Sequence, residues 1–178
     1  MMQPELHSVL ARINAVDAAL CVRINRVNRS RLVQIAFSSV SRLGDGVFWY
    51  GLMALLLMVQ REAALRPVLH MIVAGLIGLA LYKWLKRKTL RPRPCDLHPA
   101  ILRGTAPLDE FSFPSGHTLH AVTFTVVALA YYPGLAPLLV PFTLLVALSR
   151  VVLGLHYPSD VLAGAAIGYV LAMLSLLF

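Results

Sequence analysis

Long apolar runs, separated by short polar stretches, dominate the chain from Val47 onward. The runs cover Val47–Val59, Val68–Leu85, Thr118–Tyr132, Leu135–Leu153 and Val161–Phe178. A helix rises ~1.5 Å per residue and the hydrocarbon core of a bilayer is about 30 Å thick, so each run is a plausible membrane-crossing helix. The first run is short unless the residues around Asp45 and Gln60 lie at the interfaces. The pattern therefore predicts an all-α fold, a multi-pass bundle of about five to six membrane helices.

The N-terminal part has a different pattern. Apolar residues recur at helical spacing from Leu6 to Val27, but Arg12, Asp17, Arg23 and Arg26 interrupt them. This arrangement predicts an amphipathic helix that lies in the membrane interface. The alternative is a first membrane span whose arginines reach back to the headgroups. We expect Leu32–Leu43 to pack on the bundle, and we expect one domain over residues 1–178, with 1–43 as an interfacial part and 44–178 as the main bundle.

Composition supports residence in a membrane. Of the 178 residues, 58% are hydrophobic and only 13% are charged, too few to cover the surface of a soluble domain of this length. The net charge is +8, and basic residues gather between Lys83 and Arg103. Anionic headgroups attract such a loop, whereas nucleic acid is an improbable partner for so apolar a chain. Cys21 and Cys95 have no metal-ligand spacing and are expected to be isolated thiols.

Alternating spans would bring the polar segments to one membrane face. The long connection Lys83–Gly116 and the short connection Gly154–Ser159 both emerge there. As a result LYKWLKRKTLRPRP, FPSGH and SRVVLGLHYPSD should meet. Costly ionisable groups gathered at a membrane surface are functional candidates by default.

These segments hold the parts of an anion site. Ser115 is a good N-cap for a helix that starts after Pro114, and the first turn of a helix attracts anions. Gly116 lets the backbone approach such an anion closely. Lys86, Arg93 and Arg150 can add positive charge, and arginines grip phosphate with two parallel hydrogen bonds.

Three further residues suggest acid–base or nucleophilic chemistry. Asp160 follows His156 by four residues, where a carboxylate can fix the imidazole tautomer. His117 is a second imidazole for proton transfer. His120 follows His117 at a spacing that only weakly suggests a metal pair, and His7, His70 and His98 are expected to be ordinary interfacial histidines.

The segments KRKTLRPRP (Lys86 to Pro94), PSGH (Pro114 to His117) and SRVVLGLHYPSD (Ser149 to Asp160) resemble, in order and spacing, the three signature motifs of the type 2 phosphatidic acid phosphatase superfamily. Lys86 and Arg93 fit the first motif, because choosing Arg91 would put Trp84 where the lysine belongs. The resemblance covers Gly44 to Phe178.

The resemblance implies a role for each motif residue. His156 would attack phosphorus and carry a phosphohistidine, Asp160 would hold His156, and His117 would protonate the leaving oxygen. The phosphoryl oxygens would be bound by Lys86, Arg93, Ser115, Gly116 and Arg150. Positioning and charge stabilisation of this kind are what phosphoryl transfer needs. No metal and no cofactor are expected, since a metal-dependent phosphatase would lean on several carboxylates and only Asp160 lies in a motif.

The sequence leaves the substrate, the class of the protein and its orientation in the membrane open. The favoured substrates are undecaprenyl pyrophosphate and phosphatidylglycerol phosphate, and phosphatidic acid or lipid A phosphates are alternatives. An anion-binding transporter without turnover is a rival from another class. The positive-inside rule would put the basic face in the cytoplasm. Resemblance to bacterial members instead implies the inner membrane with the site at the periplasmic face, which we adopt as the expectation.

Overall fold

The chain is all-helical in the part that the structure, a computed structural model, describes: the backbone of residues 4–178 and the side chains of residues 12–178. The predicted all-α class is thus confirmed, while the expected role of His7 falls outside the described side chains. The α-helices are α1 (Pro4–Asn25), α2 (Arg31–Arg42), α3 (Phe48–Gln60), α4 (Leu65–Thr89), α5 (Pro94–Leu97), α6 (Gly116–Tyr131), α7 (Ala136–Val152) and α8 (Pro158–Ser175). Short 3₁₀ or π-helical turns occupy Arg26–Arg29, Leu43–Val47, Arg61–Ala64 and Pro133–Leu135.

Each predicted apolar run lies on a helix, from α3 through α8. Within the described residues, three helical stretches are long and apolar enough to cross a membrane: Arg31–Leu97, Pro133–Val152 and Pro158–Ser175. The first of these joins several helices end to end. The expected number of five to six membrane helices therefore stays a prediction.

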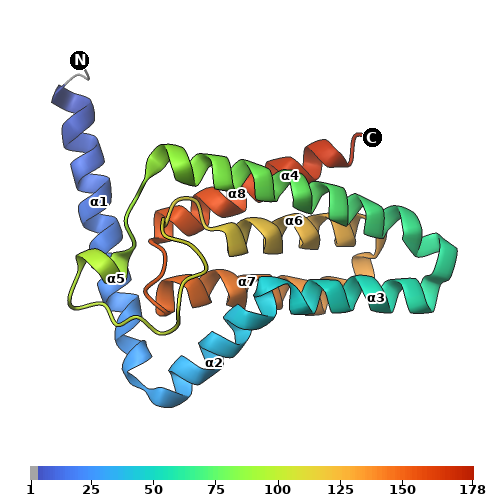
Figure 1. Cartoon of the computed structure of the whole chain (residues 1–178), viewed down its shortest axis with the longest axis horizontal. Helices are drawn as coiled ribbons and strands as arrows, with labels where there is room; N and C mark the ends of the chain where they lie inside the picture. The colour runs from blue at the N-terminus through green and yellow to red at the C-terminus, as the bar shows by residue number, and fades with distance from the viewer. Residues whose placement is uncertain (1–3) are drawn as a thin grey trace.

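Helix α6 lies at the centre of the bundle and packs against α4, α7 and α8 (Figure 1). Helices α6 and α8 approach closely because α8 carries glycines at the contact. A Cβ atom on Gly164 would lie 2.5 Å from the Ser115 carbonyl oxygen, and one on Gly168 would lie 2.4 Å from that of Leu119. The apolar core lies around α3, α4 and α6, with Trp49, Met71 and Phe124 among its members.

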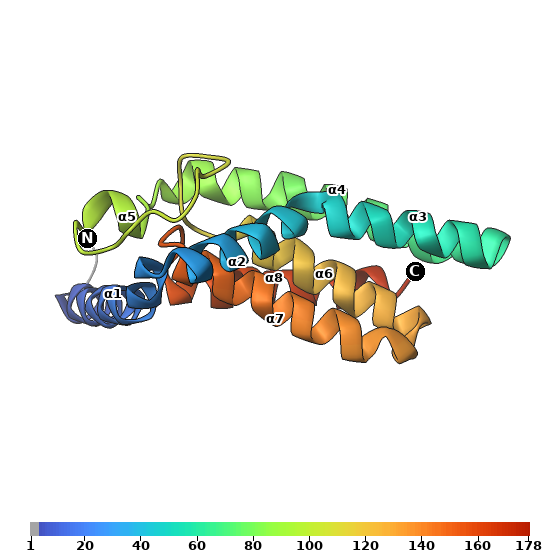
Figure 2. The same ribbon diagram turned by 90° about the horizontal axis from the view of Figure 1, so that it is seen from below.

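Helix α1 runs across one end of the bundle, the end that also holds α5 and the long loop after it (Figures 1 and 2). Its buried side chains include Asp17 and Asn25, whereas Ile13 and Val16 are exposed. Asn25 bonds the main chain of Leu102 and Val152. The inner side of α1 thus carries both polar groups, Asp17 and Asn25, and the buried apolar Cys21, while several apolar side chains point outward. Its expected place in the membrane interface stays a prediction.

Candidate active site

Six of the eight predicted site residues line one cavity of about 250 Å³ at the α1 end of the bundle, while Ser115 and Asp160 are buried and do not line it. Helix α4 and the segment after it contribute Lys86 and Arg93, α6 contributes His117, and α7 with its following turn contributes Arg150 and His156. Residues far apart in the sequence therefore converge as the alternating spans predicted.

Lys86 and Arg93 are buried and share one carboxylate. The Nζ atom of Lys86 lies 2.7 Å from Oδ1 of Asp109, and an Nη atom of Arg93 lies 2.5 Å from the same oxygen. Arg93 also donates to the Leu155 carbonyl oxygen at 2.7 Å. These contacts fix both cations at the cavity wall. The Asp109 carboxylate occupies the position beside them that a bound anion would take.

Arg150 has unused hydrogen-bonding capacity. It is only 3% exposed, and its Nη1 atom donates to the hydroxyl of Ser41. Its Nε atom is buried without a hydrogen-bond partner, and no carboxylate pairs with Arg150 among residues 12–178. A buried, unpaired guanidinium on a cavity wall is costly unless an anion joins it.

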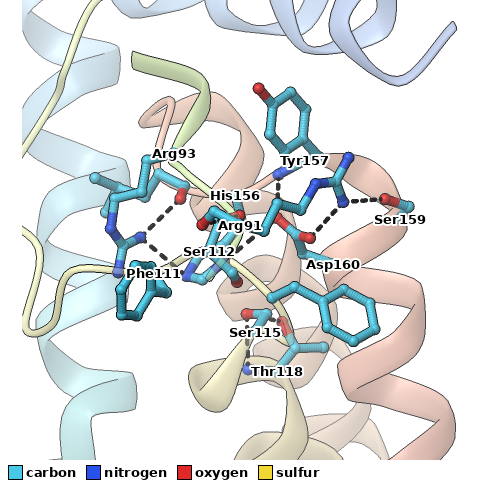
Figure 3. A network of polar contacts seen from close by, with 12 residues as sticks. Arg91, Arg93, Phe111, Ser112, Ser115, Thr118, His156, Tyr157, Ser159 and Asp160 are labelled. Atoms are coloured by element: carbon cyan, nitrogen blue, oxygen red, sulfur yellow. Dashed lines mark hydrogen bonds and ion pairs between the residues drawn. The ribbon is translucent and has the colours of Figure 1, made fainter. Parts of the chain in front are cut away.

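His156 is held through its Nδ1 atom. This atom lies 2.6 Å from the carbonyl oxygen of Ser112, which can only accept, so Nδ1 carries the proton (Figure 3). Its Nε2 atom is left with a lone pair and lies 3.4 Å from an Nη atom of Arg93. Burial, aided by the charges of Arg150 and Arg93, lowers the pKa of His156 well below its usual value. The imidazole is therefore neutral and can act as a nucleophile through Nε2.

Asp160 is fully buried and lies close to His156 without a hydrogen bond to it. Its Oδ2 atom is 3.8 Å from Nδ1 of His156 and accepts instead from the backbone N–H of Tyr157 at 2.8 Å. Its Oδ1 atom accepts from Arg91 at 2.6 Å. The Ser112 carbonyl thus sets the tautomer of His156 in this structure, and Asp160 acts on the ring through its charge.

His117 meets a carboxylate that the motifs do not contain. Its Nε2 atom contacts Asp45, which lies in the π-helical turn between α2 and α3. Gly46 makes this turn possible with a φ of +132°, a conformation that side chains other than glycine rarely adopt. Asp45 favours the protonated imidazole, but burial and the charge of Arg150 outweigh this effect and lower the pKa of His117 to about 4.

The predicted N-cap is confirmed, because α6 begins at Gly116 and the Ser115 hydroxyl accepts from the N–H of Thr118. Ser115 is fully buried and does not line the cavity, whereas Gly116 does. The role of Ser115 as a phosphate ligand stays a prediction.

The other histidines make structural contacts. The two ring nitrogens of His120 contact the carbonyl oxygens of Gly116 and Gly75, both at 3.0 Å. Those of His70 contact the Tyr131 hydroxyl and the Ser175 carbonyl. In residues 12–178, no group of three or more histidine, cysteine or acidic side chains is arranged to hold a metal.

Sequence reasoning missed the groups that bind the motif residues: Ser41, Asp45, Arg91, Asp109 and Ser112. None of these residues stands at a sequence spacing from a motif residue that would identify it as part of the site. Ser41 and Arg91 illustrate the difficulty, since Ser41 precedes the predicted main bundle and Arg91 is the arginine that the first motif passes over.

Curated relatives resemble most of the chain. Decaprenylphosphoryl-5-phosphoribose phosphatase of Mycobacterium tuberculosis is 33% identical over 154 residues, covering 86% of this chain and 81% of its own length. Undecaprenyl-diphosphatase of Sulfolobus acidocaldarius is 32% identical over 138 residues, covering 76% of this chain and 66% of its own length.

Solved structures share the fold. LpxE of Aquifex aeolicus superposes with a TM-score of 0.70 at 27% identity, covering 90% of this chain and 94% of that one. A membrane phosphatidylglycerolphosphate phosphatase of Bacillus subtilis gives a TM-score of 0.67 at 23% identity, covering 92% and 84%. The second likeness concerns the fold alone.

The family assignment rests on the family model together with these relatives. The model of the PAP2 superfamily matches residues 64–178, which contain all three motifs. Relatives named as phosphatases cover most of the chain, so the rival reading as a transporter without turnover is not supported. The chain therefore belongs to the PAP2 superfamily and is a membrane-associated lipid phosphatase, a hydrolase of phosphoric esters.

Proposed function

We propose that this phosphatase acts on a polyprenyl-linked phosphate or pyrophosphate, such as undecaprenyl pyrophosphate, through a phosphohistidine on His156. Phosphatidylglycerol phosphate is the second candidate. The observation that carries the proposal is the composition of the cavity. Its cationic end joins an apolar wall formed by Trp49 and Met53 of α3, Ile72, Leu76 and Leu79 of α4, and Phe124 of α6.

The apolar wall suits a lipid chain. Along α4, the lining residues run from Lys86 back to Ile72, a distance of roughly 20 Å at the rise of an α-helix. Leu76 is 60% exposed, so this side of α4 is open to the surroundings of the helix. The relatives named for polyprenyl substrates support the same choice.

The proposed reaction has two steps. The Nε2 lone pair of His156 attacks phosphorus, the bond from phosphorus to the leaving oxygen breaks, and His117 protonates that oxygen. Water then attacks the phosphohistidine and gives up a proton to His117, the phosphorus–nitrogen bond breaks, and inorganic phosphate leaves. Lys86, Arg93, Arg150 and the Gly116 backbone would bind the equatorial oxygens, with Asp160 acting on His156 by its charge.

Metal-independent turnover is part of the proposal. Arginine and lysine provide the positive charge at the cavity, and its carboxylates, Asp45 and Asp109, already contact cationic or imidazole partners. Activity that persists in EDTA would support this part. Loss in EDTA with recovery on adding a divalent ion would overturn it.

We also propose that the active-site end of the bundle faces the periplasm of a bacterial inner membrane, with about five to six membrane helices. Support comes from the gathering of the motif residues at one end. Labelling of single cysteines placed at Leu108 and Gly134, near opposite ends of α6, with an impermeant maleimide tests the orientation.

The deciding experiment is phosphate release in detergent from undecaprenyl pyrophosphate, decaprenyl phosphoribose phosphate, phosphatidylglycerol phosphate, phosphatidic acid and lipid A. We expect the polyprenyl substrates to have the highest kcat/KM. His156→Ala should abolish release, and quenching of wild type with ³²P-labelled substrate in alkaline SDS should trap a phosphoprotein that is stable to base and labile to acid. A higher kcat/KM for a glycerolipid would overturn the substrate assignment, and turnover by His156→Ala would overturn the covalent mechanism.

A further inference from the structure

Arg91, which the first motif passes over, lies at the centre of a polar network behind His156 (Figure 3). One Nη atom donates to Oδ1 of Asp160 at 2.6 Å and to the hydroxyl of Ser159 at 2.7 Å. The guanidinium also lies over the ring of Tyr157, 4.1 Å from its centroid, a favourable cation–π distance. Arg91 therefore contacts three residues at the start of α8: the N-cap Tyr157, and Ser159 and Asp160 of the first turn.

Asp17 of α1 completes the network from the other side. Its Oδ2 atom accepts from the second Nη atom of Arg91 at 2.7 Å, and its Oδ1 atom accepts from the backbone N–H of Ser159 at 2.9 Å. The Ser159 hydroxyl also contacts Asp17. Asp17 is only 4% exposed, and a carboxylate on the first-turn N–H groups of α8 benefits from the helix dipole. The α1 helix is thereby tied to the start of α8.

The network reaches both proposed catalytic histidines through Asp160. The side chain of Asp160 accepts from the N–H of Tyr157, the residue after His156. Its carbonyl oxygen accepts from the N–H of Ser115 at 3.0 Å, two residues before His117. A displacement of Asp160 would therefore shift both histidines relative to the phosphate.

The main chain of Arg91 adds a second connection. Its carbonyl oxygen accepts from the N–H of Ser112 at 2.8 Å and from the Ser112 hydroxyl at 3.2 Å. The carbonyl of Ser112 in turn holds Nδ1 of His156. Arg91 thus supports Ser112 with its backbone and Asp160 with its side chain, and only the second contact is lost on substitution.

We propose that Asp17, outside the three motifs, and Arg91, at a position within the first motif that its pattern leaves open, are positioning residues for the phosphatase reaction, which hold Asp160 and the first turn of α8 and so place His156 and His117. The inference rests on the proposed roles of these histidines. Arg91 also balances the charge of Asp160, and Asp17 orients Arg91. The α1 helix is accordingly a working part of the active site.

The electrostatic consequence can be measured. Loss of the Arg91 charge leaves the Asp160 carboxylate, 3.8 Å from Nδ1 of His156, less compensated, which favours the imidazolium form. The other charged or titratable groups facing His156 stay in place: Lys86 and Arg93 from α4 and the segment after it, His117 from α6, and Arg150 from α7. Arg91→Gln should therefore raise the pKa of His156.

The experiment compares Arg91→Gln, Arg91→Lys and Asp17→Asn with wild type on one lipid phosphate. We expect kcat of Arg91→Gln to fall on the order of 10–100-fold, the usual cost of losing a partner that orients a reacting group, with KM changed less than about 3-fold. The acid limb of its kcat/KM profile should move up by about 0.5–1 pH unit. Arg91→Lys should keep the acid limb near that of wild type. Asp17→Asn should lower kcat and leave the acid limb at its wild-type position.

The matched control is Asp96→Asn, which breaks the exposed ion pair of Asp96 and Arg103 on the nearby loop and should leave kcat and the acid limb unchanged. Histidine-selective ¹⁵N NMR in detergent follows the protonation of His156 without turnover, so it tests the inference even if wild type hydrolyses no tested lipid. Wild-type kcat and an unshifted acid limb in Arg91→Gln would overturn the inference. So would an equal fall in all variants, control included, or an unshifted His156 titration in the NMR experiment.

Discussion

The Nδ1 atom of His156 lies 2.6 Å from the carbonyl oxygen of Ser112, so a main-chain group sets the tautomer of the proposed nucleophile. A carbonyl oxygen does not titrate, so it accepts a hydrogen bond from a protonated ring nitrogen at any pH. Nε2 therefore keeps its lone pair facing the cavity. This relationship makes the pH dependence of the enzyme the first quantity to measure.

Activity should persist on the acid side of the ordinary imidazole range. The folded protein lowers the pKa of His156 by burial and by the charges of Arg150 and Arg93, and the neutral form is the nucleophile. The nucleophile is lost only when the pH falls through this lowered value, so phosphoenzyme formation should continue below about pH 6.5. A rapid-quench measurement of the first step from pH 4.5 to 8 checks this. An acid limb centred above pH 7 would contradict it.

Asp109→Asn should bind phosphate more tightly. The Asp109 carboxylate occupies Lys86 and Arg93, the donors that a substrate phosphoryl group needs. Removing this competing charge should lower KM and the inhibition constant of inorganic phosphate by about 3–10-fold, the scale of one charged hydrogen bond, with kcat within about 2-fold. Glu110→Gln, at the next position, is the control and should change neither. A raised KM in Asp109→Asn would instead mean that Asp109 positions the cations.

His117→Ala and Asp45→Asn should fail in the same selective way. Proton donation to the leaving oxygen is worth about 10²–10⁴-fold when that oxygen is an alkoxide, and much less when it is a phosphate or a nitrophenolate. Both variants should lose most activity on monoester lipids and retain more on pyrophosphate lipids and nitrophenyl phosphate. Comparing kcat/KM across these leaving groups, after checking the fold, tests the pairing. Uniform losses for His117→Ala would leave it as a phosphate ligand only.

Arg150→Lys should cost on the order of 10²–10³-fold in kcat, the scale of one stabilising donor. Lysine keeps the positive charge but cannot direct an Nε–H and an Nη–H at two phosphoryl oxygens together. The buried, unpartnered Nε atom of Arg150 is the donor in question. Steady-state kinetics on one lipid substrate are sufficient, with Arg66→Lys, at the far end of the bundle, as the control. Near wild-type kcat would show that only diffuse charge matters at this position.

Gly164→Ala should destabilise the bundle by about 1–3 kcal/mol, the usual cost of overpacking. The added Cβ would lie 2.5 Å from the backbone carbonyl of Ser115, so α8 or the start of α6 must move. Gly51→Ala on α3 is the matched control: its Cβ meets nothing within 4 Å, and alanine favours a helix by ~1 kcal/mol over glycine. Thermal unfolding in detergent should separate the two. Equal melting temperatures would show that the helices adjust without cost.

Local sequence signals were enough for the helices and for the residues that carry the family motifs. The apolar runs from Val47 onward mark where helices form, because an apolar stretch that is long enough to cross a bilayer can satisfy all of its own backbone hydrogen bonds as a helix. Ser115 before Gly116 marks the start of α6 through side-chain capping, a contact within one turn. The spacing from Lys86 to Arg93 likewise identified the two cations that the structure brings to one carboxylate.

Only the tertiary structure decided which acid faces which base. Asp17 and Arg91 are 74 positions apart, and Lys86 meets Asp109 across the long loop. No periodicity or spacing links such residues, since their encounter depends on how α1 crosses the bundle end and how the loop returns over the cavity. Asp45 meets His117 for the same reason, through the turn at Gly46. The sequence by itself thus determined the helices and the chemical groups of the site, whereas long-range packing decided which group neutralises, orients or competes with each of them.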